Sequence, residues 1–76
     1  MGIKYIVKSG MSQDFFLVKD VKNFLGIIIP YAFQHVKLPW EIAIFDSKND
    51  AIEAIGIARE HDGGDYLPII LETVIK

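Results

Sequence analysis

The N-terminal part of the chain has the two-residue period of a β-strand. Ile3, Tyr5 and Val7 occupy alternate positions, with Lys4 and Lys8 among the intervening residues. Successive side chains of a strand point to opposite faces, so these three apolar residues share one face. We therefore expect an opening strand with one apolar face.

Residues 48–62 have the period of an amphipathic helix. Ser47 and Asp50 have the spacing of a capping box, in which the serine hydroxyl satisfies a free backbone N–H and the acid reaches back. Gly63 and Gly64 end the helix, because glycine adopts the left-handed conformation without a Cβ clash. The expected buried stripe is centred on Ile55 and includes Ala51, Ile52 and Ala58.

The same helix has a glycine in its middle. Gly56 costs about 1 kcal/mol relative to alanine at such a position, which suggests that a neighbouring backbone approaches it closely. Ile57 lies on the side of the helix away from Ile55, among acidic residues. We expect Ile57 to be exposed.

Residues 66–75 predict a closing strand. One face holds Leu67, Ile69, Leu71, Thr73 and Ile75, and the other holds Tyr66, Ile70 and Val74. Pro68 has no N–H to donate to a sheet. It therefore indicates the start of a strand or a strand at the sheet edge.

Residues 12–26 fit two structures. As a helix they have an apolar stripe, with Ser12 as its cap and Gly26 as its end. As a strand, residues 14–19 pair with residues 3–8. The strand suits Phe15 and Phe16, which a helix would leave on its polar side.

The two structures give two folds. The strand gives a small two-layer α+β domain, in which an antiparallel meander is followed by a helix at about residues 48–62 and a C-terminal strand. The alternative is a ferredoxin-like βαββαβ fold with a second helix at about residues 13–25. We favour the meander.

The most apolar run covers residues 24–33 and is interrupted by Gly26 and Pro30. A transmembrane helix needs about 20 consecutive apolar residues, so this run predicts a buried strand or core segment. The N-terminus contains lysines and has no small-residue cleavage site, unlike a signal peptide. We expect a cytoplasmic protein without a membrane partner.

Composition limits what the core can be. The chain has 76 residues, 51% of them hydrophobic, and residues 1–76 are expected to form a single domain. A chain of this length buries only roughly 60% of its unfolded surface. Because cysteine is absent, disulfides, thiolate zinc sites and thiol nucleophiles are excluded.

Charge is distributed unevenly along the chain. Residues 1–40 carry five lysines and two aspartates, whereas residues 41–76 carry three basic and eight acidic residues. The acidic half indicates a solvated helix face or complementarity to a basic partner. The N-terminal lysines suggest nucleic-acid binding, but a pI of about 5.5 argues against it.

Three segments carry a resemblance to a protein family. They are KYIVKSG (residues 4–10), FFLVKD (15–20) and EIAIFDSKNDAIEAI (41–55). Their spacing resembles that of small uncharacterised proteins encoded by phages and prophages of Gram-positive bacteria, although Ala43 departs by one position from the family's strand-to-helix junction. The resemblance implies a mobile-element origin, an opening strand hairpin and a site in the host cytoplasm. It implies no catalytic residue.

No catalytic or metal-binding motif emerges. His61, Asp62 and Asp65 cluster in sequence, but a solvated helix C-terminus, where an imidazole suits the helix dipole, explains them better than a metal site. Ser47 caps a helix, and His35 falls on an apolar strand face where a structural role suits it. We expect no enzyme, no metal and no cofactor.

Apolar residues exceed what one helix on one sheet face can cover, so a second helix, a folded loop or a partner chain is needed. Trp40 is either an interface anchor or a residue that pins its turn. The expected partner surface comprises Trp40, Ile57, Tyr66, Ile70 and Val74.

These features favour a small protein-interaction module that binds another protein or forms a homodimer. One alternative is an inhibitor of a host defence enzyme, of the anti-CRISPR type. The other is a weak nucleic-acid-binding module that uses the lysine-rich half.

Overall fold

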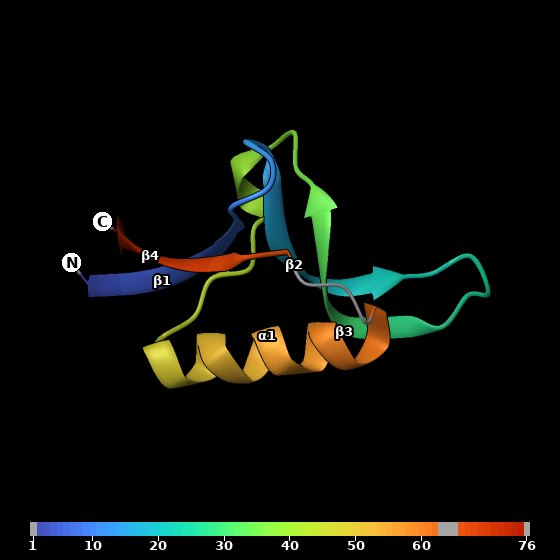
Figure 1. Cartoon of the computed structure of the whole chain (residues 1–76). Coiled ribbons are helices and arrows are strands. Elements are labelled where there is room, and N and C mark those ends of the chain that lie inside the picture. The colour runs from blue at the N-terminus through green and yellow to red at the C-terminus, as the bar shows by residue number, and fades with distance from the viewer. Residues whose placement is uncertain (1, 63–65, 76) are drawn as a thin grey trace.

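Four antiparallel strands and one α-helix make up the chain in the computed structural model, which describes residues 2–62 and 66–75. The elements follow in the order β1 (Gly2–Ser9), β2 (Phe15–Lys22), β3 (Ile28–His35), the 3-10 helix η1 (Pro39–Glu41), α1 (Lys48–Asp62) and β4 (Pro68–Ile75). The strand order in the sheet is β3-β2-β1-β4, and α1 runs along one side of it (Figure 1). The predicted α+β fold with an antiparallel meander is confirmed.

The second strand decides between the two folds that the sequence allowed. Residues 15–22 form β2, so the helix at about residues 13–25 is wrong and the fold is not ferredoxin-like. Aromatic and β-branched residues suit the pleated, half-buried surface that β2 provides. Its main partner is β3, with a register that runs from Phe15 opposite His35 to Lys22 opposite Ile28.

The first two strands touch only where they meet the turn between them. Their register contains the single pair Lys8 and Phe16. The observed pairing is therefore much shorter than the predicted one, which joined residues 14–19 to residues 3–8. Residues 42–45 enter the fork between the diverging strands. Tyr5 and Phe45 exchange two backbone hydrogen bonds of 2.9 and 2.8 Å, and Ala43 N–H donates to the carbonyl of Leu17 at 3.0 Å.

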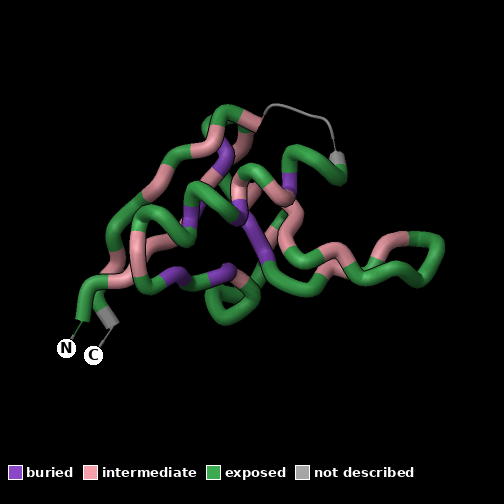
Figure 2. The backbone as a smooth tube through the Cα atoms, turned by 90° about the horizontal axis from the view of Figure 1, so that it is seen from below, coloured by how far each residue is buried: buried purple, intermediate pink, exposed green. Residues whose placement is uncertain are grey.

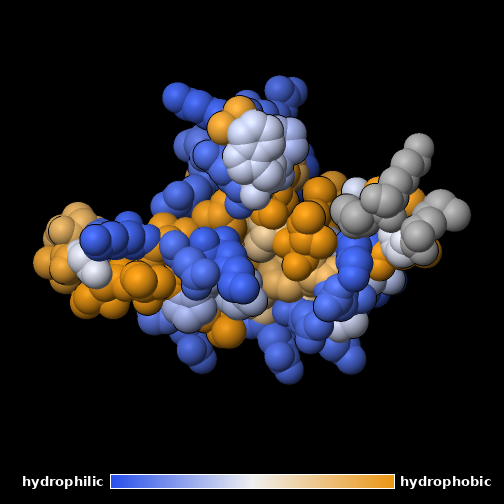
Figure 3. Space-filling view, turned by 180° about the vertical axis from the view of Figure 1, so that it is seen from behind, coloured by the Kyte–Doolittle hydropathy of each residue, from blue (hydrophilic) through white to orange (hydrophobic). Residues whose placement is uncertain are grey.

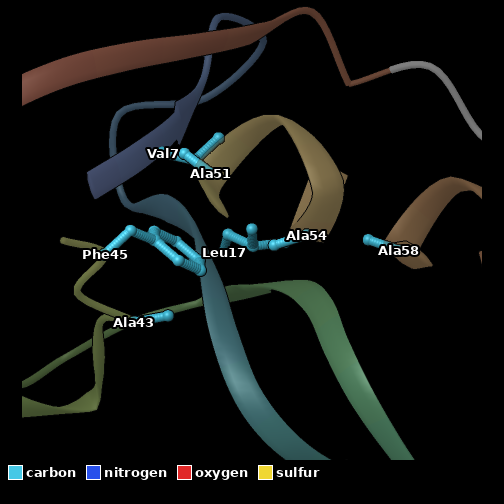
Figure 4. Packing of buried hydrophobic residues seen from close by; sticks show 7 residues of the cluster. All are labelled: Val7, Leu17, Ala43, Phe45, Ala51, Ala54 and Ala58. Carbon is cyan, nitrogen blue, oxygen red and sulfur yellow. The ribbon is translucent and has the colours of Figure 1, made fainter. Parts of the chain in front are cut away.

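The core lies between the helix, the fork and the sheet. Its buried members are Val7, Leu17, Ala43, Phe45, Ala51, Ala54 and Ala58 (Figure 4). Seen from below, the buried positions gather at the centre of the molecule, and most of the surrounding backbone is exposed or half-buried (Figure 2). Tyr5 packs against this cluster, so the apolar face predicted for the first strand points inward for Tyr5 and Val7.

The helix has the predicted bounds and, apart from one residue, the predicted buried stripe: Ala51 and Ala58 are buried, and Ile55 is half-buried against the core. The Asp50 N–H donates to Ser47 Oγ at 3.1 Å, which confirms the predicted serine cap. Ala54 joins the two predicted alanines on the buried face, whereas Ile52 is 56% exposed and the prediction for it is wrong. Alanine lets the helix backbone lie close to the sheet, where Leu17 and Phe45 fill the space. The predicted stop at Gly63 and Gly64 lies outside the described residues.

The mid-helix glycine has no neighbour. A Cβ built at Gly56 meets nothing within 4 Å, and the residue is exposed. The predicted close approach of another backbone is therefore wrong.

The last strand begins at Pro68 and lies at the sheet edge, as the proline indicated. Its two faces have roles opposite to the expected ones. Ile70 lies opposite Val7 and packs against the core, whereas Ile69 and Leu71 are exposed. Both faces of this strand are apolar in sequence, so alternation alone does not determine which face the helix covers.

Candidate interaction surface

The five residues of the predicted partner surface lie in different places. Trp40 is exposed on η1, and Val74 is exposed near the end of β4. Ile57 of α1, predicted to be exposed, is half-buried. Ile70 is half-buried and packs against the core, and half-buried Tyr66 contacts the rings of Phe15 and Phe33. These residues do not form one continuous surface.

Tyr66 belongs to an aromatic cluster that supports the fold. Its ring lies 5.2 Å from that of Phe15 and 5.1 Å from that of Phe33, measured between centroids. The buried Ser9 hydroxyl donates to the Tyr66 carbonyl at 2.6 Å, which fixes the chain before β4. Tyr66 thus has a structural role.

His35 joins the edge of the same cluster. Its ring meets that of Phe15 at 4.8 Å in an edge-on arrangement. It also lines an open cleft of about 350 Å³ with Asp20 and Glu41. Glu41 Oε2 accepts hydrogen bonds from the backbone N–H groups of Lys37 and Leu38, at 3.2 and 3.4 Å. Within residues 2–62 and 66–75, no hydrogen bond or ion pair joins His35 to a carboxylate.

One sheet face remains partly uncovered, as the apolar excess predicted. On the side of the β1–β4 ladder away from α1, Ile6 lies opposite Leu71 and Lys8 lies opposite Ile69. Ile69 and Leu71 are exposed and Ile6 is half-buried. The residues on this face are therefore not those the sequence indicated.

The most exposed apolar residues lie where β2 turns into β3. The hairpin tip consists of four side chains with large exposed fractions, namely Phe24 (95%), Leu25 (67%), Ile27 (57%) and Ile28 (63%). The hairpin projects from the body of the protein, and the space-filling view shows apolar atoms gathered on it (Figure 3, left). The prediction that the run of residues 24–33 is a buried segment is wrong for this part.

The hairpin tip is built by local hydrogen bonds. Asn23 Oδ1 accepts the N–H groups of Leu25 and Ile27 at 2.9 and 3.0 Å, and the Gly26 N–H donates to the Asn23 carbonyl at 3.0 Å. Gly26 has φ of +84°, a conformation that favours glycine. An asparagine directly before an apolar run and a glycine inside it are turn signals, so this turn was detectable in the sequence.

A second cleft lies beside the N-terminal half of α1. This acidic cleft has a volume of about 300 Å³ and is lined by Tyr31, Ile44, Phe45, Asp46, Asp50, Glu53, Ala54 and Ile57. Its carboxylates are exposed, while most of its apolar residues are buried or half-buried. Lys4 Nζ pairs with Asp46 at its edge. The cleft therefore combines an apolar interior with a negatively charged rim.

No family model, curated protein or solved structure that we compared with the chain matches it. Within the described residues, no helix is both long and apolar enough to cross a membrane.

Proposed function

We propose that the chain is a small protein-interaction module whose contact surface is the hairpin tip. The observation that carries the proposal is the exposure of four large apolar side chains on one ordered turn. Fully burying one such side chain is worth about 1.5–3 kcal/mol, and an isolated chain gains little of this at the tip. A partner that covers the tip recovers it.

The polar parts of the hairpin support the same proposal. Asn23 and Gly26 hold the tip in one conformation, so little conformational entropy is lost when a partner binds. Phe24 resembles the aromatic anchors that dominate protein interfaces. The resemblance to phage and prophage proteins supports an accessory role in the cytoplasm of a host cell.

Photo-crosslinking in living cells tests this function. A photoreactive phenylalanine analogue at position 24 is expected to give a discrete protein adduct on a denaturing gel. The same analogue at Gln13, which is exposed in the turn between β1 and β2, is the matched control and is expected to give none. Absence of any discrete adduct at position 24 would contradict the proposed function.

A further inference from the structure

We propose that the hairpin tip binds a second copy of this chain, with the tip of each copy seated in the acidic cleft of the other. This inference rests on the proposed function and names the partner. It assigns one occupant to each of two unpartnered features of the same molecule, a basic apolar projection and an acidic apolar cleft.

The tip carries positive charge at its base. Lys19 and Lys22 are exposed on the last part of β2, and Asp20 is the one acidic residue between Phe15 and Trp40. The side chain of Lys22 reaches to the turn, where its Cε lies 3.8 Å from the position of a Cβ built on Gly26. A partner that contacts the apolar side chains of the tip therefore also contacts the ammonium group of Lys22.

The acidic cleft offers the complementary chemistry. Its volume of about 300 Å³ suits one or two apolar side chains, and its half-buried Ile57 and Tyr31 provide apolar contact. Of its carboxylates, Asp46 already pairs with Lys4. No ion pair of Asp50 or Glu53 occurs in the part of the chain that the structure describes, so both can receive the lysines of a partner.

The hairpin projects away from the body of the protein (Figure 1), so its tip does not line the acidic cleft of its own chain. The molecule measures 39 × 22 × 21 Å, and the hairpin projects beyond the C-terminal end of α1 (Figure 1). The cleft is lined by α1 between Asp50 and Ile57, by residues 44–46 and by Tyr31 of β3. Two copies side by side in opposite directions bring each tip to the partner's cleft. Such a twofold arrangement makes the contact twice and closes the assembly.

Sedimentation of the purified full chain tests the dimer. We expect a dimer whose dissociation constant rises by roughly 30-fold or more in Phe24→Asp, because an apolar anchor is lost from both contacts. Ile52→Asp is the matched control, since Ile52 is an exposed apolar residue outside both features, and it is expected to keep the dimer. Circular dichroism and thermal melting establish that each variant is folded.

Mixing two defective variants tests the reciprocal geometry. Phe24→Asp has a damaged tip and an intact cleft, whereas Glu53→Lys has an intact tip and a damaged cleft. An equimolar mixture is expected to form a heterodimer through one intact contact, although each variant alone is monomeric. Lys22→Glu combined with Glu53→Lys in one chain is expected to restore the homodimer, because the charges are exchanged. Failure of both combinations would overturn the reciprocal contact.

Other outcomes separate this inference from the proposed function. A wild-type chain that stays monomeric at high concentration overturns the dimer, while an adduct at position 24 with a different protein still supports an interaction module. Flotation with vesicles that contain anionic phospholipid is the second arm. Binding of the monomer to these vesicles, abolished by Phe24→Asp, would overturn the second copy as occupant and show a lipid surface instead.

Discussion

Two glycines of this protein, Gly26 and Gly56, differ in their surroundings and in their backbone conformation. Gly56 is exposed on the helix with open space around it, and Gly26 occupies a turn with positive φ. Only one of the two glycines therefore has a structural reason to be glycine. At position 26 the backbone conformation favours glycine, whereas at position 56 neither space nor conformation does.

Gly56→Ala is expected to stabilise the protein by about 1 kcal/mol. Alanine reduces the entropy that the chain loses on forming the helix, and its methyl group meets no neighbour. Chemical denaturation monitored by far-UV circular dichroism measures the change. Gly26→Ala is the contrasting variant and is expected to lower the free energy of unfolding. A lower free energy of unfolding for Gly56→Ala would contradict the absence of a neighbouring group around this position.

Elements show how far the sequence determines the structure. The helix at residues 48–62, its serine cap and the position of Pro68 follow from local physical rules and were predictable. Phe15 and Phe16 favour the strand predicted for residues 14–19, because aromatic residues prefer the pleated surface of a sheet, and the structure extends this strand to Lys22. These features arise within a few residues of the chain.

Other elements depend on distant partners, and the sequence alone could not place them. Residues 42–45 enter the fork between β1 and β2, which no local pattern specifies. Pairing with the distant strand β1 likewise determines that Ile70, and not Ile69, faces the core. At the candidate site, hydrophobicity alone predicts one buried segment over residues 24–33, whereas Asn23 and Gly26 fold the first part of that run into a turn.

The helix surface that contacts the sheet is made largely of alanines, which leave little space for a larger side chain. Ala54→Leu is expected to destabilise the protein by about 1–3 kcal/mol, because three further carbons have no space between α1 and the buried Leu17. Denaturant melts provide the measurement. Ile52→Leu, on the exposed side of the same helix, is expected to leave the free energy of unfolding nearly unchanged. Equal effects at both positions would contradict the assigned buried face.

At the scale of the whole molecule, a small core joins elements that are far apart in sequence. Val7, Leu17, Phe45 and the helix alanines meet in one cluster, so loss of one member affects all the elements at once. A protein of this length has a free energy of unfolding of about 4–11 kcal/mol, following the per-residue range for native proteins. Each buried side chain is therefore a large share of the stability.

Leu17→Ala is expected to lower the free energy of unfolding by about 2–5 kcal/mol. Leu17 is fully buried, and its truncation leaves a cavity beneath the helix. Equilibrium denaturation followed by both near-UV circular dichroism, which reports the packed aromatic rings, and far-UV circular dichroism is expected to show one coincident transition at lower denaturant. Separate transitions for the two probes would contradict a single cooperative core.

The arrangement of the strands also has a consequence for the order of folding events. β2 and β3 are neighbours in sequence and need only a short loop to pair, whereas the β1–β4 ladder joins Ile3 to Val74 and closes nearly the whole chain. We expect the β2–β3 hairpin to form early and the β1–β4 ladder to form last. The apolar turn that projects from the finished protein would then already be present in a half-folded chain, where it is also a starting point for aggregation.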